Sequence, residues 1–257
     1  MNIPIKKNKK LGKIIKKVEN HTRLNTLWDC SNVMVMDRQG FSDHGPVHVA
    51  IVANIALKLL RNLIQSEISP SIVKEYSFDN NDAEIVVVLG SVLHDIGNAV
   101  HRYDHERTSV YLSNKILEEL LEGVYKQKEM QIMICEILHT IICHDGGDIV
   151  TIEAGVIKLA DALDMKQGRA RIPFERGIQD IYSVSAMAIN EVNIHKNKHK
   201  PISIEIELGN SAGIFQIDNL LKNKLKDSPI ERYVEVIAKV KEGKEKKIIR
   251  KYELKND

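Results

Sequence analysis

The chain has few aromatic residues, few cysteines and no long apolar run. Aromatic side chains make up 5% of its 257 residues. The three cysteines (Cys30, Cys135 and Cys143) are odd in number and form no Cys-x-x-Cys pair, which favours a reduced, cytoplasmic compartment. The lysine-rich N-terminus lacks the apolar segment of a signal peptide. No apolar run reaches the roughly 18–20 residues of a spanning helix, so we expect no membrane association.

A strong net charge is also missing. The formal charge of +2 gives no case for nucleic-acid binding by the protein as a whole. Hydrophobic residues at 43% and charged residues at 28% are ordinary for a globular protein. Residues 1–27 read as a basic lead-in with a short amphipathic helix. We expect its lysines to lie on a helix face that is exposed to solvent. The alternative is that they form an arm that binds phosphate groups.

The apolar spacing changes along the chain and predicts two domains. Residues 28–195 are expected to form an all-α domain, and residues 196–257 a small α+β domain that serves dimerisation or substrate shaping. Apolar residues recur at helical offsets, which predicts helices at 44–64, 83–96, 104–122, 127–144 and 152–166. The spacing of apolar residues alone does not exclude a strand for residues 83–96. Alternating apolar residues predict strands near 202–208, 234–240 and 248–254, with a helix over 217–225 and a turn at 242–244.

His94 and Asp95 are the most informative pair in the sequence. They follow an apolar run through Val92 and Leu93 and precede Ile96-Gly97-Asn98. Buried polar groups need partners, and a divalent metal ion is the partner that uses both an imidazole and a carboxylate.

Other histidines and aspartates could complete such a site from neighbouring helices. They are His48, His105, His144 and Asp161, which with His94-Asp95 belong to five predicted elements. A lone histidine among apolar residues is more often a hydrogen-bonded core residue than a ligand. Six such residues on five elements are difficult to explain separately, and helix bundles commonly build metal sites from facing helices.

The order and the flanking residues of these positions resemble the HD-domain metal-dependent phosphohydrolases. The strings that carry the resemblance are HVAIVANIAL, VLHDIGN, HERTSVYL, IICHDGG and VIKLADALDMKQGRAR, within about residues 40–175. The resemblance implies a helical HD-domain bundle. It also implies one metal on His48, His94, Asp95 and Asp161, and a second on Asp95, His105 and His144. Relatives with the additional histidines include bacterial dinucleoside-tetraphosphate hydrolases.

Cyclic-dinucleotide phosphodiesterases of the same family fit less well. Their GYP signature is absent, and Asp145 stands where some of them carry a further histidine. Mixed imidazole and carboxylate ligands suit Mn, Fe, Co, Ni or Zn, with Mg possible. Two such ions about 3.5–4 Å apart can share a hydroxide for an in-line attack on phosphorus, and a carboxylate such as Asp95 is suited to bridge them.

Further residues are candidates for catalysis or phosphate binding. His101 could donate a proton to the leaving oxygen, as similar histidines do in nucleotide triphosphohydrolases of the family; a solvent-facing loop histidine is the alternative. His44 could face the same cleft as His48. Arg102, Lys158, Arg169 and Arg171 could bind phosphate, with surface ion pairing as the alternative. Asp164, one turn from Asp161, could support the ligands, whereas His139 is expected to be structural.

The leading interpretation is a phosphohydrolase of nucleotides or related phosphate esters and anhydrides, with catalysis resting on Asp95 and His101. The partners we expect are a small phosphate substrate and a second copy in a homodimer. Three alternatives stay open. They are a mononuclear nucleotidase or deoxynucleotide triphosphohydrolase, a ligand-sensing protein without turnover, and a nuclease or RNA-binding protein that uses the basic arm.

Overall fold

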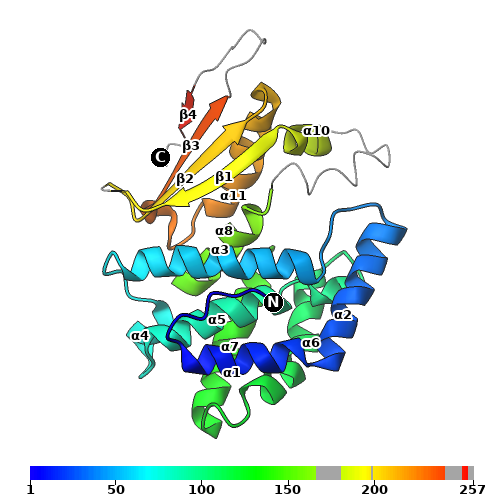
Figure 1. Ribbon diagram of the computed structural model, residues 1–257, viewed down its shortest axis with the longest axis vertical. Helices are drawn as coiled ribbons and strands as arrows, with labels where there is room; N and C mark the ends of the chain where they lie inside the picture. The colour runs from blue at the N-terminus through cyan, green and yellow to red at the C-terminus, as the bar shows by residue number, and fades with distance from the viewer. Residues whose placement is uncertain (166–180, 198, 241–250, 254–257) are drawn as a thin grey trace.

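The computed structural model is a helical bundle with a four-stranded sheet on one side (Figure 1). The structure describes residues 1–165, 181–197, 199–240 and 251–253. The larger helices are α1 (Lys9–Glu19), α2 (Thr22–Asn32), α3 (Pro46–Ile64), α5 (Asn80–Leu93), α6 (His105–Leu121), α7 (Gln127–Cys143) and α8 (Ile152–Ala162). The short helical segments among them are η1 (Val33–Arg38), α4 (Ser71–Glu75) and η2 (Ile96–Ala99).

Helix α5 is the centre of the bundle and packs against α3, α7 and α8. Its residues from Ile85 to Leu93 are all buried, as the apolar run in the sequence requires. Asp79 begins the helix with a capping box, in which its side chain accepts the Asp82 N–H and the Asp82 carboxylate accepts the Asp79 N–H. The strand alternative for 83–96 is therefore wrong, and α5 delivers His94 and Asp95 to the middle of the bundle.

The start of α3 differs in detail from the expectation of a helix beginning at residue 44. The cap residue is Gly45, and Pro46 is the first helical residue. Asp43 still stabilises this end, because its Oδ1 accepts the backbone N–H groups of Gly45 at 3.2 Å and His48 at 3.1 Å. The carboxylate thus satisfies N–H groups that the first helical turn leaves without a partner.

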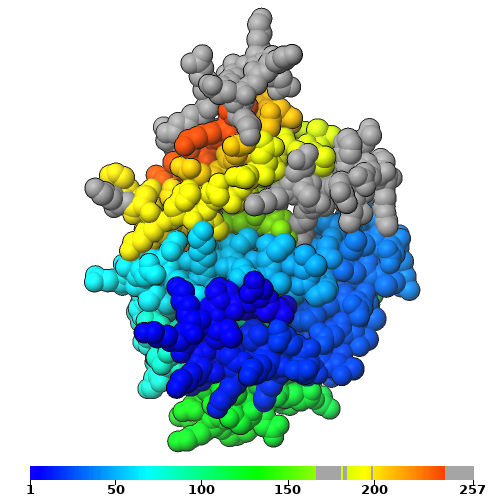
Figure 2. Space-filling model, viewed as in Figure 1, coloured from blue at the N-terminus to red at the C-terminus, as the bar shows by residue number. Residues whose placement is uncertain are grey.

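Helix α3 is the one helix within the described residues that is long and apolar enough to cross a membrane, judged by length and composition only. Half of this stretch is buried in the bundle, and a core helix passes the same test. Its neighbours α5 and α8 cover the buried side. In the space-filling view, the other side forms a band between β1 and the N-terminal segment (Figure 2).

The basic lead-in predicted for residues 1–27 is part of the bundle. Leu11, Ile14, Ile15 and Val18 of α1 are buried in the common hydrophobic core, and α1 packs on α5. Lys9, Lys13 and Lys16 of the helix are exposed. Lys10 Nζ lies 2.7 Å from Asp82 Oδ1, and Lys17 Nζ donates to the backbone oxygens of Glu119 and Glu122.

The C-terminal part is α+β, as the alternating pattern predicts. Its elements are α10 (Ile181–Met187), β1 (Ile189–His195), β2 (Ile202–Leu208), η3 (Ser211–Gly213), η4 (Gln216–Leu221), α11 (Lys222–Leu225), η5 (Glu231–Tyr233), β3 (Val234–Val240) and β4 (Lys251–Glu253). The strand order is β1-β2-β3-β4, with β2 antiparallel to β1 and parallel to β3. The crossover from β2 to β3 carries η4 and α11, which pack against α8 (Figure 1). The turn predicted at 242–244 lies outside the described residues.

One sequence assignment needs correction. Residues 189–195 were assigned to the all-α domain, but they form β1 and pair with β2. The sheet therefore begins before the predicted boundary at residue 196. The pairing register shifts between Ile189 and Glu191, so the apolar residues Ile189 and Val192 do not alternate regularly.

Candidate metal centre

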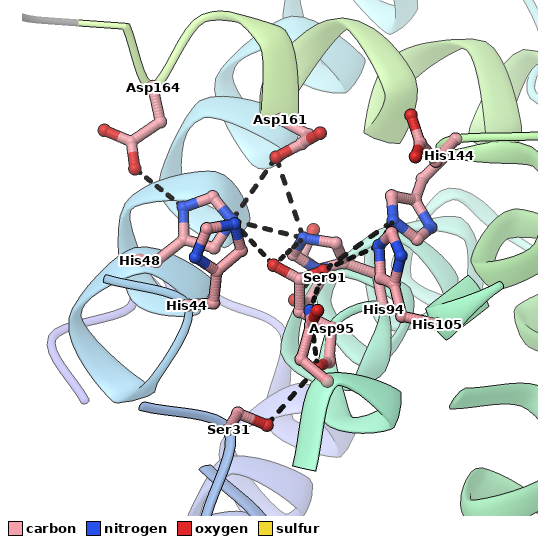
Figure 3. A network of polar contacts seen from close by, with 12 residues as sticks. Ser31, His44, His48, Ser91, His94, Asp95, His105, His144, Asp161 and Asp164 are labelled. Carbon is pink, nitrogen blue, oxygen red and sulfur yellow. Dashed lines mark hydrogen bonds and ion pairs between the residues drawn. The ribbon is translucent and has the colours of Figure 1, made fainter. Parts of the chain in front are cut away.

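Six residues from five structural elements meet in the middle of the bundle (Figure 3). His48 comes from the first turn of α3, and His94 and Asp95 follow the end of α5. His105 is the first residue of α6, His144 follows α7, and Asp161 lies near the end of α8. The side chains of the first five are at most 5% exposed, whereas that of Asp161 is 22% exposed. The cluster is therefore accessible mainly on the Asp161 side.

The carboxylate of Asp95 divides the cluster into two halves. Its Oδ2 lies 3.3 Å from Nε2 of His48 and 3.3 Å from Nε2 of His94. Its Oδ1 lies 3.2 Å from Nε2 of His105 and 3.8 Å from Nε2 of His144. We call the His48–His94–Asp161 group with Oδ2 the first half, and the His105–His144 group with Oδ1 the second half.

The donor atoms of the first half have the spacing of a coordination shell. Asp161 Oδ1 lies 3.3 Å from His48 Nε2 and 3.7 Å from His94 Nε2, and these two nitrogens are 3.2 Å apart. Metal–ligand bonds of about 2.0–2.1 Å in a tetrahedron place neighbouring donors about 3.4 Å apart. In the second half, the Nε2 atoms of His105 and His144 are 3.0 Å apart.

The other nitrogen of each of the four histidines fixes the ring orientation. Nδ1 of His94 lies 2.7 Å from the Ser91 carbonyl oxygen, and Nδ1 of His144 lies 2.6 Å from that of Ile141. Nδ1 of His105 lies 3.1 Å from the Arg102 carbonyl oxygen. Because a carbonyl oxygen only accepts, Nδ1 must carry the proton in all three rings.

His48 follows the same rule with a carboxylate as its partner. Its Nδ1 lies 2.7 Å from Oδ2 of Asp164, which therefore supports a ligand as the sequence suggested. In the neutral rings all four Nε2 atoms present lone pairs to the centre. The lone pair on Nε2 of His48 then faces that of His94, with no proton between them. The same holds for His105 and His144. A cation satisfies such an arrangement, so the residues fit a divalent metal.

Without a cation, protons must balance the charges of the buried Asp95 and the partly exposed Asp161. Burial alone would lower the pKa of His94, but Asp95 and Asp161 outweigh it and raise the pKa to about 10. Burial would raise the pKa of Asp95, but the charge of His94 holds it well below its usual range. Burial and the charge of His94 lower the pKa of His144 to about 3. A proton on His94 and a metal ion thus neutralise the same carboxylates, and metal binding displaces the proton.

The structure brings some of the remaining predicted residues close to this centre. The buried ring of His44 lies 5.6 Å from that of His48, measured between centroids (Figure 3). Lys158 is half-buried on α8, one turn before Asp161. Arg102 reaches the site indirectly, since its Nη1 donates to Asn98 Oδ1 at 3.2 Å.

Other predicted residues do not reach the centre or lie beyond what the structure describes. His101 is exposed, and its Nδ1 accepts the Tyr103 N–H at 3.1 Å. No hydrogen bond or ion pair among the described residues joins it to the six ligands, and its proton-donor role stays a prediction. Arg169 and Arg171 lie outside the described residues.

Three further residues contact the site and were not singled out by the sequence. Asn98 Nδ2 donates to Asp95 Oδ1 at 3.0 Å, and its place within VLHDIGN could have drawn attention to it. Glu106 Oε2 lies 3.6 Å from His105 Nδ1, and Glu106, Asp145 and His105 form a further group with metal-ligand spacing. Lys224 contacts His144 and Asp145 from α11, where no motif marks it.

The fold and the site together define a helical protein with a buried histidine and aspartate centre suited to a divalent metal. The HD domain family model matches residues 47–166, which include all six predicted ligands. The chain is 45% identical over 223 residues to the uncharacterized protein MJ1020 of Methanocaldococcus jannaschii, and the alignment covers 86% of each chain. The chain belongs to the HD-domain family. HD domains are generally found in metal-dependent phosphohydrolases.

Proposed function

We propose that this protein hydrolyses a small phosphate ester or anhydride, with nucleotides as the leading substrate class, at a centre of two divalent ions. The observation that supports two ions rather than one is the position of Asp95. Its two oxygens face different pairs of histidines, and both pairs have Nε2 directed inward. A mononuclear site would use Oδ2 alone and would leave His105 and His144 without a role.

The donor set restricts the metals. Four imidazoles and two carboxylates suit Mn, Fe, Co, Ni or Zn better than Ca, and Mg is a weaker candidate. When bound, a pair of such ions lowers the pKa of a water molecule and offsets the negative charge of the phosphoryl oxygens during in-line displacement.

The residues of the chain supply position and access. The Nδ1 hydrogen bonds hold each imidazole in one orientation, and Asn98 holds Asp95 by donating to its Oδ1. Asp161 is the most exposed of the six ligands, so the substrate phosphate enters on the α8 side. His101 stays our candidate proton donor to the leaving oxygen. This role requires the turn that carries His101 to move towards the centre.

Metal analysis joined to a substrate panel tests the proposal. Purified protein is assayed for bound metals and for hydrolysis of nucleoside mono-, di- and triphosphates and p-nitrophenyl phosphate with Mn, Ni, Co or Mg. We expect metal-dependent phosphate release by the wild type. We expect loss of both bound metal and activity in Asp95→Ala, and neither loss in the control Asp29→Ala, whose side chain is exposed on α2. Full activity in Asp95→Ala, or no hydrolysis of any substrate with any metal, would refute it.

A further inference from the structure

A glycine on α8 allows the C-terminal part to approach the metal centre. A Cβ atom at Gly155 would lie 2.6 Å from Ser228 Oγ and 3.2 Å from Ile230 Cγ1. Since such distances are too short for ordinary packing, the missing side chain is what lets this segment lie against α8. Leu225 and Ile230, which lie on either side of Ser228 in the sequence, are both buried. The preceding helix α11 is thereby held beside the second half of the centre.

Lys224 is the residue of α11 that reaches the centre. Its Nζ donates to the backbone oxygen of His144 at 3.0 Å and to Oδ1 of Asp145 at 2.7 Å. The ion pair with Asp145 is partly exposed, with the two side chains 24% and 46% accessible. Exposed pairs of this kind contribute little to stability, so folding gives only a weak reason for the lysine.

Lys158 is a second lysine, on the helix against which α11 packs. It lies on α8, three residues before Asp161, the ligand through which the centre is accessible. Helix α8 packs against α11, the helix that carries Lys224. Burial and then the charge of Lys224 lower the pKa of Lys158. Among the described residues, Lys158 has no hydrogen-bond or ion-pair partner. Within that part of the chain, Asp145 is paired with Lys224 alone, and a half-buried cation without a counter-ion, such as Lys158, favours an anion beside it.

We propose that Lys158 and Lys224 form an anion subsite beside the second half, where they bind a second phosphate group of the substrate. This inference rests on the proposed function and deepens it, because it predicts a substrate with two or more linked phosphates rather than a monoester. One phosphate lies at the metal centre, and the next is bound by the two ammonium groups at the open α8 side.

Binding of two phosphonates to metal-loaded protein tests the subsite without any hydrolysis. Methylenebisphosphonate carries two linked phosphonate groups, whereas methylphosphonate carries one. We expect the wild type to bind the bisphosphonate more tightly in isothermal titration. Lys158→Met and Lys224→Met should each weaken bisphosphonate binding about tenfold, as expected for one charge-assisted hydrogen bond, and leave methylphosphonate binding unchanged. Methionine keeps an apolar stem of similar length.

The matched control is Lys222→Met, which removes an exposed lysine of the same helix and should change neither affinity. Metal content, measured before and after each titration, should be equal in all proteins. Equal weakening of both phosphonates, or no preference of the wild type for the bisphosphonate, would overturn the proposal. If Lys224→Met fails to fold or loses metal, Lys158→Met decides, with Lys158→Arg expected to retain the preference.

The same titrations separate this inference from the proposed function. A bisphosphonate preference that depends on the lysines, in a protein that hydrolyses nothing, would support the subsite and refute the hydrolase. Metal-dependent hydrolysis combined with unchanged binding in both lysine variants would support the hydrolase and refute the subsite.

Discussion

The pair formed by His48 and Asp164 gives the sharpest test of how the first half is built. Asp164 Oδ2 accepts the Nδ1 proton of His48 at 2.7 Å, and the two side chains are 8% and 1% exposed. In Asp164→Ala the ring loses the acceptor that fixes its proton on Nδ1 and its orientation. Removing such a partner of a ligating histidine costs about 10–100-fold in metal affinity, or about 1.4–2.7 kcal/mol.

The loss should be confined to one of two metal sites. Titration of metal-stripped protein with Mn²⁺, with stoichiometry from elemental analysis, should show one weakened site and one unchanged site, since His48 faces only Oδ2 of Asp95. Asp148→Ala, at an exposed position, is the control for loss of a carboxylate. Unchanged affinity, or equal weakening of two sites, would contradict the division into halves.

Three other changes test the second half, the packing and the pH dependence. His105→Ala should remove one metal equivalent and leave the other, and two equivalents retained in elemental analysis would contradict the dinuclear assignment. In Gly90→Ala the new Cβ would lie 2.2 Å from Thr140 Oγ1 and 2.3 Å from Ile157 Cδ1. Urea unfolding should therefore show a free energy of unfolding lower by about 1–3 kcal/mol. An unchanged midpoint would show that α7 and α8 move apart without cost. Burial raises the pKa of Glu153 above its usual 4.5, so folding favours the protonated carboxyl. Its contribution to stability is full below pH 4.5 and is lost as the pH rises through the raised pKa of the folded state. The wild type should therefore lose stability relative to Glu153→Gln as the pH is raised above 4.5, and a constant difference would disprove this.

The ligands could be predicted because each one stands out from the residues next to it in the sequence. His94-Asp95 ends an apolar run, and His48 and Asp161 each follow apolar residues on a helix, so the polar residue is conspicuous where it stands. The family resemblance then supplied their grouping. The structure brings all six together as that resemblance implied.

What could not be predicted depends on tertiary packing. Lys224 lies among ordinary surface lysines, and the packing of α11 against α8 brings it to His144. Strand β1 was missed because the register shift near Ile189 interrupts the alternation on which strand prediction depends. His101 was proposed from its similarity to histidines of nucleotide triphosphohydrolases; its ring is exposed beside Tyr103 in the turn after η2, and its proton-donor role stays a prediction.

The shared carboxylate of Asp95 has a consequence for how the centre fills. Both of its oxygens turn together about one side-chain bond, so an ion that fixes Oδ2 in the first half also fixes Oδ1 for the second. Binding of the first ion therefore fixes the Asp95 carboxylate for both sites. The second ion does not have to order this side chain again, so it should bind with positive cooperativity. By linkage, each ion raises the affinity of the centre for the other by the same factor.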